Sequence, residues 1–463
     1  MNQNKVFLQK VFALLAIIAL LGGLGFPAAS AVAASPQAPT AYQSVIVQAK
    51  DSQLAATMVE QYGGRVTSKL EIIASVGALV PVNEVAALRS DAHVVRVSAN
   101  AETVLAESGF DRTPANVPNT DYPDVTGANL AWQAGALGQG VTVAVIDTGI
   151  ARHPALMKDE NGNPRRIVVG WVDFVEGKNE PTDPNGHGTH IAGIIANAQK
   201  GPDGEYNGMA PAVQLVGIRV LDKTGAGNYE QVIEGIQWAI QNKDRYNIRV
   251  INLSLHSLVQ SPYWADPLNQ AVMHAWADGI VVVVAAGNDG PKPMTISVPG
   301  NNPYVITVGA FTDNYTPSNW NDDYLTEFSS AGPTLDGFVK PDLLAPGGHI
   351  TSTMLPGSYI ARSHEANWVD SLYFAMAGTS QAAAVTTGAV AQVIGAHPDL
   401  TPDQVKYRMM YTALPWVKPD GSDVLYSVWQ QGAGRLNVFD AVNAQDINGS
   451  ANTGLNIQTD MTT

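Results

Sequence analysis

Three side chains of the 463-residue sequence, Asp147, His187 and Ser380, have the types and the order required for nucleophilic catalysis. Asp147 ends the apolar run "VTVAVID", His187 stands between two glycines in "NGHGTH", and Ser380 lies in "AGTSQAAA". A carboxylate, an imidazole and a hydroxyl can serve as orienting acid, general base and nucleophile. Asp…His…Ser is one of the chain orders in which this triad occurs.

Each of these residues also has a structural alternative. Ser380 precedes a run of Ala and Val that is typical of a helix buried on all sides, so its hydroxyl could be a plain N-cap. Asp147 could form a turn, and His187 could be a packing histidine. The flanking glycines favour a close approach to the imidazole of His187.

A fourth polar residue, Asn288, follows the apolar run "IVVVVAAG" at another strand-to-loop junction. Its side-chain amide has the donor needed to stabilise a developing oxyanion.

The elements that must position these residues begin near Ala128, where short continuous apolar runs alternate with amphipathic helices. This alternation predicts an α/β fold with a mostly parallel sheet covered by helices on both faces. Sites in such sheets form at the carboxyl ends of the strands. The predicted strands span residues 141–147, 213–221, 249–255, 280–287 and 304–311.

The preceding residues predict a small, separate unit. Strand-like and helix-like segments follow one another as β-α-β-β-α-β between residues 44 and 100, with Asn83 capping the second helix, and this order is ferredoxin-like. Residues from about 101 to 122 lack periodicity and are interpreted as a linker or processing region. The polar composition of residues 446–463 predicts a disordered tail.

The first 34 residues have the composition of a secretory signal peptide. Lys5 and Lys10 precede the apolar run 11–24, and small residues follow, so we expect cleavage between Ala31 and Ala34. The apolar run is shorter than the about 20 residues that span a bilayer. An uncleaved membrane anchor is the alternative.

Composition narrows the classes of protein further. The chain has no cysteine, which excludes a thiol nucleophile and thiolate metal sites. A formal net charge of −15 argues against a nucleic-acid partner and for a soluble exported protein.

From about Ala131 to Val442 the sequence resembles the subtilisin-like serine proteases. "GQGVTVAVIDTGI", "NGHGTHIAG" and "MAGTSQAAA" resemble the aspartate, histidine and serine blocks of that family, and "AAGNDG" resembles its oxyanion block. The resemblance implies a doubly wound peptidase domain, here 109–445. It also implies an inhibitory, chaperone-like propeptide, here the ferredoxin-like α+β unit 35–108.

The resemblance assigns a role to each site residue. Ser380 would attack the scissile carbonyl, His187 would move the proton, Asp147 would fix the imidazole, and Asn288 with the Ser380 amide would hold the oxyanion. His190 is then a packing residue. An H-x-x-H metal site is the alternative for the two histidines, although no Glu lies between them.

The family pattern also implies how a peptide and ions would bind. A substrate strand would lie between two edges, with a P1 pocket walled by small residues; these residues are Gly225, Ala226, Gly227, Ser254, Leu255, His256, Ala285, Ala286 and Gly287. The chemistry requires no cofactor, whereas structural calcium is compatible with the family. The resemblance leaves alternatives for the calcium ligands. Ala155 replaces an Asp that is a common ligand, and Asp203 and Glu205 either bind calcium or belong to a solvated loop.

We therefore expect a secreted, monomeric serine endopeptidase that acts on polypeptides. Once its signal peptide is cleaved, it would not be stably associated with a membrane. Its propeptide would inhibit it and be cut autocatalytically between about Ala101 and Asp121, with the propeptide C-terminus lying product-like in the cleft. One rival is a catalytically silent binding protein on the same scaffold. A second is an esterase with the same triad, which would not need the two peptide-binding edges.

Overall fold

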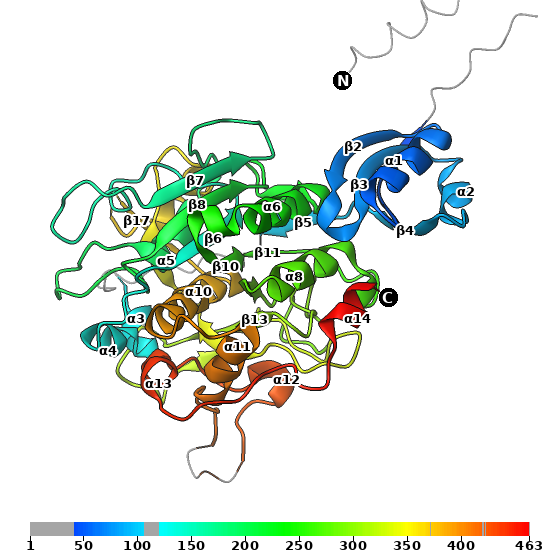
Figure 1. Cartoon of the computed structure of the whole chain (residues 1–463). Helices are drawn as coiled ribbons and strands as arrows, with labels where there is room; N and C mark the ends of the chain where they lie inside the picture. Colours follow the sequence, from blue (N-terminus) through cyan, green and yellow to red (C-terminus); the bar gives the residue numbers. More distant parts are fainter. Residues whose placement is uncertain (1–40, 106–119, 371, 419–420, 422, 463) are drawn as a thin grey trace, which may run out of the picture. The chain divides into compact units, whose positions relative to one another are not determined.

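The computed structural model describes residues 41–105, 120–370, 372–418, 421 and 423–462. The expected signal peptide (1–34) and most of the expected processing region lie outside these residues. The described chain contains a small N-terminal α+β unit followed by a large α/β unit (Figure 1).

The N-terminal unit has the expected β-α-β-β-α-β order. Its antiparallel sheet has the strand order β2-β3-β1-β4. Asp51 caps the first helix by accepting a hydrogen bond of 2.8 Å from the Leu54 amide. The sequence predicts Asn83 as the cap of the second helix, but the N-cap position is Glu84, which makes no side-chain cap hydrogen bond. The elements are β1 (Tyr42–Ala49), α1 (Ser52–Gln61), β2 (Arg65–Leu70), η1 (Glu71–Ile73), β3 (Ser75–Pro81), α2 (Val85–Arg89) and β4 (Val94–Ala99).

An eight-stranded sheet forms the centre of the large unit, and all its strands are parallel except β14. The path β14-β13-β12-β10-β6-β8-β7 is extended by β15, which pairs with β13. The strands are β6 (Thr142–Asp147), β7 (Val168–Asp173), β8 (Gln214–Arg219), β10 (Ile248–Leu253), β12 (Val281–Ala285), β13 (Ile306–Thr312), β14 (Tyr324–Leu325) and β15 (Leu343–Pro346).

All five strands predicted from apolar runs are present, because a strand buried on both faces needs apolar residues at every position. Every residue of β6, for example, is buried. Two parallel strands were not predicted. β7 lies at the sheet edge and is only partly buried, and β15 has four residues and ends in Pro346.

Helices cover both faces of this sheet (Figure 1). α5 (His187–Ala196) packs against α10 (Thr379–Ala396), and α6 (Tyr229–Gln241) packs against α8 (Pro267–Ala277). α10 is buried from Thr379 to Ile394, as expected of a helix that is apolar on all sides. The large unit also contains α3 (Tyr122–Thr126), α4 (Ala128–Gln133), α7 (Lys243–Tyr246), α11 (Pro402–Tyr411), α12 (Val428–Gln431) and α13 (Val438–Asn443).

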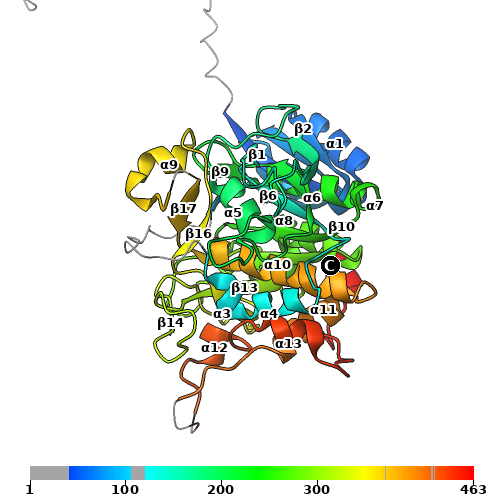
Figure 2. The ribbon, with the colours of Figure 1, turned by 90° about the vertical axis from the view of Figure 1, so that its left-hand side faces the viewer.

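The segment before the serine block forms a separate excursion. β16 (Ile350–Thr353) and β17 (Tyr373–Met376) pair as antiparallel strands, with α9 (Tyr359–Ser363) between them in the sequence (Figure 2). The amides of Tyr359 and Ile360 donate to the carbonyls of Pro184 and Asn185, at 2.9 and 3.0 Å. This excursion therefore braces the loop that leads into His187.

The two units are joined by a three-stranded sheet. β5 (Glu102–Leu105) pairs antiparallel with β9 (Ala226–Asn228) on one side and β11 (Leu255–His256) on the other. The N-terminal unit also bonds to the helices of the large unit. Gln48 Nε2 donates to Gln270 Oε1 at 3.1 Å, and the Ile72 amide donates to Gln237 Oε1 at 3.3 Å.

The C-terminal tail differs from the disorder that its composition predicts. Residues 446–462 are described and end in α14 (Ile457–Thr462). Asp460 Oδ2 accepts hydrogen bonds from the hydroxyls of Tyr263 and Tyr304, at 2.8 and 2.6 Å. Polar side chains thus hold this segment through specific hydrogen bonds, which a composition argument does not detect. Within the described parts of the chain, no helix is both long and apolar enough to cross a membrane.

Candidate active site

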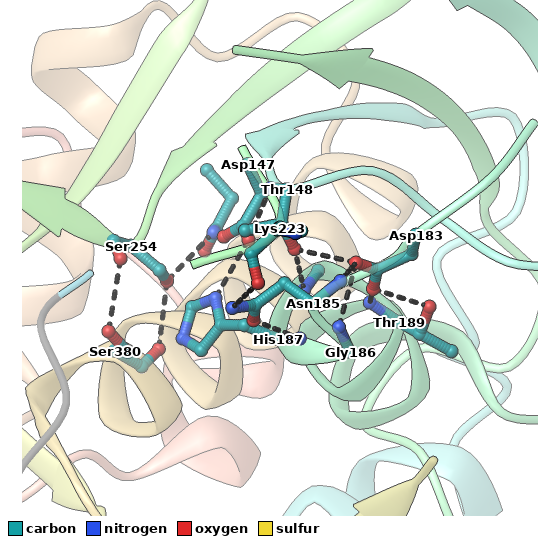
Figure 3. A network of polar contacts seen from close by, with 12 residues as sticks. Asp147, Thr148, Asp183, Asn185, Gly186, His187, Thr189, Lys223, Ser254 and Ser380 are labelled. Atoms are coloured by element: carbon teal, nitrogen blue, oxygen red, sulfur yellow. Dashed lines mark hydrogen bonds and ion pairs between the residues drawn. The ribbon is translucent and has the colours of Figure 1, made fainter. Parts of the chain in front are cut away.

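Asp147 and His187 form a buried pair at the carboxyl edge of the sheet. Asp147 is the last residue of β6, and His187 is the first residue of α5. Asp147 Oδ1 lies 2.7 Å from His187 Nδ1, and neither side chain is exposed (Figure 3). A Cβ atom at Gly188 would lie 2.1 Å from the Gly149 carbonyl oxygen, so only glycine allows this approach.

Ser380 lies near the start of α10, where the helix dipole is positive. Its hydroxyl donates to the Ser254 carbonyl at 3.1 Å, and the Ser254 hydroxyl donates to the Ser380 carbonyl at 2.9 Å. In Figure 3 the ring of His187 lies between Asp147 and Ser380. The α/β topology therefore brings together three residues that are far apart in the sequence.

Asn288 presents an amide donor next to Ser380. Its Oδ1 atom accepts hydrogen bonds from the amide and the hydroxyl of Thr379, both at 3.0 Å. Because these bonds hold the oxygen of the Asn288 amide toward Thr379, the amide nitrogen faces the opposite direction. Asn288 Nδ2 is buried and has no hydrogen-bond partner among the described residues. A buried donor without a partner, beside a serine, suits an oxyanion that forms only during a reaction.

A second layer of polar residues, not identified from the sequence, holds the loop before His187 (Figure 3). Asp183 accepts hydrogen bonds from Thr148 Oγ1 and the Gly186 amide, both at 2.8 Å, and from Thr189 Oγ1 at 2.7 Å. Burial raises the pKa of Asp183. The signal was available, since Asp-x-Asn-Gly before a helix is a turn and cap pattern.

Residues 138–446 match the model of the subtilase family. The chain belongs to the subtilase family. Serine protease AprX of Bacillus subtilis (strain 168) is 44% identical over 313 residues, which are 66% of this chain and 67% of AprX. Subtilisin DY of Bacillus licheniformis is 37% identical over 288 residues, 62% of this chain and 88% of that protein. Subtilisin E of Bacillus subtilis (strain 168) is 31% identical over 421 residues, 89% and 94% respectively.

This subtilase is a subtilisin-like serine protease, and both the family and the α/β fold agree with the sequence prediction. Family membership implies polypeptide substrates.

The two edges predicted for substrate flank β5 in this subtilase. Thr103 is paired with Gly227 and Val104 with Ala226 on one side, while His256 is paired with Val104 and Leu255 with Leu105 on the other. Gly225 directly precedes β9 at φ +85°, in the left-handed region that favours glycine. The strand β5 is thus held from both sides, as an extended peptide would be.

The three residues predicted to wall the P1 pocket follow one another at the end of β12. Ala285, Ala286 and Gly287 are all buried. A Cβ atom at Gly287 would lie 2.8 and 2.9 Å from the hydroxyls of Ser297 and Ser330, so this position has no room for a side chain.

Burial lowers the pKa of two other histidines near the site. His190 Nε2 lies 2.9 Å from the Phe374 carbonyl oxygen, and burial lowers the pKa of His190 to about 3. This agrees with a packing role. The half-buried His256 at the substrate edge also has a pKa lowered by burial, while nearby Asp289 acts to raise it.

Subtilases commonly bind structural calcium, and three carboxylates lie near one another in this chain. Asp124, Asp203 and Glu205 lie close together, and burial followed by the neighbouring Glu205 raises the pKa of Asp124 to about 7. Carboxylate oxygens are the kind of ligand that Ca²⁺ prefers. Ala155, which replaces an expected Asp, is buried and offers no side-chain oxygen.

Proposed function

We propose that the protein is a secreted serine endopeptidase that uses Asp147, His187 and Ser380, and that it matures by cutting off its own N-terminal unit. The observation that carries this proposal is the hydrogen bond of 2.7 Å between His187 Nδ1 and Asp147 Oδ1. In Figure 3 the ring of His187 lies on the side of this pair that faces Ser380. Because the Asp147 carboxylate would accept the hydrogen carried by His187 Nδ1, His187 Nε2 is the nitrogen that can act as the base.

The mechanism follows from these positions. Ser380 Oγ attacks the scissile carbonyl carbon, and its proton goes to His187 Nε2. The carbonyl electron pair moves to oxygen, where Asn288 Nδ2 and the Ser380 amide donate hydrogen bonds. Collapse breaks the C–N bond as His187 returns the proton to the leaving amine. Water then repeats the sequence on the acyl ester and releases Ser380.

The substrate would bind as a strand between Gly225–Gly227 and Ser254–His256, with its P1 side chain against Ala285, Ala286 and Gly287. The position of β5 between β9 and β11 supports this mode of binding and supports inhibition by the chain's own N-terminal unit. Autoprocessing would hydrolyse a bond between about Ala101 and Asp121. The domain limits proposed are 1–34, 35–108, 109–445 and 446–463.

The remaining parts of the proposal rest on the sequence. The N-terminal signal pattern supports export, after which the protein would act as a soluble monomer on polypeptides, with no nucleic-acid partner. For structural calcium, Asp124, Asp203 and Glu205 would supply oxygen ligands. The catalytic steps need no cofactor.

The test compares the wild type with Ser380→Ala and with Ser450→Ala, which alters an exposed serine. Intact mass and hydrolysis of an unfolded protein substrate are measured. We expect the wild type and Ser450→Ala to lose about 100 N-terminal residues and to degrade substrate, while Ser380→Ala keeps its N-terminal unit and is inactive.

The rival classes give different results. If the wild type binds unfolded polypeptides without cutting them, the silent binding scaffold replaces the proposal. Hydrolysis of esters without peptides would favour an esterase. Removal of the N-terminal unit from Ser380→Ala would show that another protease performs the processing.

A further inference from the structure

A buried cluster of two carboxylates and one imidazole lies outside the catalytic site. Asp121 directly precedes α3, Asp313 directly follows β13, and His349 directly precedes β16. Their side chains are at most 5% exposed. His349 Nε2 lies 3.0 Å from Asp121 Oδ2 and 3.1 Å from Asp313 Oδ1. The topology thus brings three distant segments to one point.

A single imidazole can neither donate a hydrogen bond from Nε2 to both carboxylates nor neutralise two negative charges. Nε2 carries at most one hydrogen, yet two carboxylate oxygens face it at nearly the same distance. With a neutral imidazole the two aspartates place two negative charges in a buried position, and with an imidazolium one negative charge remains. Buried charge without a partner is costly, and either a proton on one carboxyl or an additional cation would offset it.

A second observation points to a ligand. Asp313 Oδ2 is buried and has no hydrogen-bond partner among the residues that the structure describes. A cation between the two carboxylates would interact with this oxygen, whereas a hydrogen bond from His349 to Oδ1 leaves it unused. Arg435 does not supply this cation, because its guanidinium forms an ion pair with another carboxylate: Arg435 Nη1 lies 2.8 Å from Asp323 Oδ2.

We propose that Asp121, Asp313 and His349 form a structural site for a divalent transition-metal ion of the Zn²⁺ class. Donor atoms around a tetrahedral ion with bonds of about 2.1 Å lie about 3.4 Å apart. The separations of 3.0 and 3.1 Å from Nε2 are close to that value, and one donor atom from each of the three residues lies within 4.8 Å of the others. An imidazole donor favours zinc or a similar ion over calcium or magnesium.

The surroundings orient the imidazole as a ligand. Thr312 Oγ1 lies 3.2 Å from His349 Nδ1, which directs Nε2 toward the two carboxylates. The ring of Tyr315 stacks on the imidazole, with a centroid separation of 3.8 Å and an angle of 26° between the planes. Such partners commonly fix the ring of a metal-binding histidine.

The site would fasten the start of the peptidase domain. Asp121 lies at the end of the region in which the proposed autoprocessing occurs, so this role rests on the proposed function, whereas metal binding itself does not. An ion held by Asp121, Asp313 and His349 would tie the residues before α3 to the ends of β13 and β16.

The test uses the full chain carrying Ser380→Ala, which prevents self-digestion without touching the cluster. After chelator treatment, Zn²⁺ is added against a chromophoric competitor, and metal content and Tm are measured. We expect one tightly bound Zn²⁺ per chain, a rise in Tm on binding, and affinity at least tenfold lower with His349→Asn. His93→Asn is the matched control, since His93 also lies 3.1 Å from an aspartate but is exposed.

Asp313→Asn gives the same comparison if His349→Asn fails to fold. Co²⁺ bound to the unmodified cluster should give visible d–d absorption typical of nitrogen and oxygen ligands, which requires no substitution at the site. Absence of Zn²⁺ binding, or binding unchanged in both His349→Asn and Asp313→Asn, overturns the proposal. A response to Ca²⁺ alone, removed by Asp124→Asn, also overturns it. None of these outcomes depends on proteolytic activity, so the triad proposal is tested separately.

Discussion

At the scale of residues, Thr379 fixes the orientation of Asn288, the proposed oxyanion donor. Thr379 occupies the oxygen of the Asn288 amide with two hydrogen bonds, and the nitrogen is left as a buried donor. The donor is therefore oriented before any substrate binds. Preorganised donors of this kind stabilise a transition state without reorganisation.

Asn288→Ala should lower kcat by about 10²- to 10³-fold and leave KM nearly unchanged, because the donor acts only once negative charge develops. That range was measured in subtilisin itself, a relative of this protein. Steady-state kinetics on a peptide substrate give both constants. The exposed Asn321→Ala is the control, and a loss confined to KM would contradict the assignment.

At the scale of elements, β5 joins the N-terminal unit to the two predicted substrate edges, because it pairs with β9 and β11. Its side chains alternate, with Thr103 buried and Val104 38% exposed. Glu102 is further held through its carbonyl, which accepts a hydrogen bond of 2.6 Å from Ser257 Oγ. Inhibition should therefore depend on what the buried position of β5 carries.

Thr103→Val should strengthen inhibition of the mature enzyme by the separate N-terminal unit. Thr103 Oγ1 is buried without a partner among the described residues, and Val has nearly the same shape without the hydroxyl. An unsatisfied buried polar group costs about 1 kcal/mol or more, which corresponds to about fivefold or more in the inhibition constant. Val104→Thr, on the exposed side of the strand, should change the constant little, and an unchanged Thr103→Val would contradict the argument.

Helix α6 adds a pH dependence to the same interface. Glu230 and Gln237 both bond to the N-terminal unit, and Glu234 lies four and three residues from them on the same helix face. Burial, and then the charge of Glu230, raises the pKa of Glu234 to about 7. Removal of the N-terminal unit exposes this face, so the pKa of Glu234 should fall toward the ordinary value of about 4.3.

The complex therefore binds a proton more readily than its separated parts. Inhibition should be strongest below pH ~4.3, weaken as the pH rises to about 7, and then change no further at this residue. Inhibition constants measured from pH 5 to 8 test this for the wild type and Glu234→Gln. The variant should show a flatter profile, and equal slopes in both proteins would contradict the prediction.

At the scale of the whole molecule, a buried network of two lysines and one aspartate links the late helices to the sheet. Lys340 Nζ lies 2.6 Å from Asp342 Oδ2, and Lys406 Nζ lies 3.1 Å from Asp342 Oδ1. Both ammonium groups also donate to the Val305 carbonyl, at 2.9 and 3.0 Å. Burial, opposed by Asp342, lowers the pKa of Lys340 to about 7.

This shift predicts that stability increases on the alkaline side. An unfolded lysine titrates near pH 10.4, so between about pH 7 and 10 the unfolded state binds more protons than the native state. The free energy of unfolding should then rise with pH, by at most about 1.4 kcal/mol per pH unit from this residue. Denaturant unfolding of the Ser380→Ala chain between pH 7 and 9 measures it. Lys340→Met should reduce the rise, the exposed Lys292→Met should not, and a flat profile in the unaltered chain would refute it.

The sequence by itself determined the fold class and the identities of the proposed catalytic residues. Short continuous apolar runs rich in Val and Ile are typical of strands that are buried on both faces, and Asp147 and Asn288 lie at the ends of two of those runs. The glycines beside His187 were predicted to leave room near the imidazole, whereas a Cβ atom at Gly188 would lie against the Gly149 carbonyl oxygen. The inference of the fold class succeeded because hydrophobic patterning is written into short stretches of chain.

The tertiary structure alone decided which distant residues meet. Contacts between segments far apart in the chain join Asp183 to Thr148 and insert β5 between β9 and β11. They also bring Asp121, Asp313 and His349 together and orient Asn288 Nδ2, which has no hydrogen-bond partner among the described residues. The packing of residues 446–462 belongs to the same class, because composition records polarity but not hydrogen-bond partners. Long-range pairing of polar groups has no sequence period, so only the folded chain reveals it.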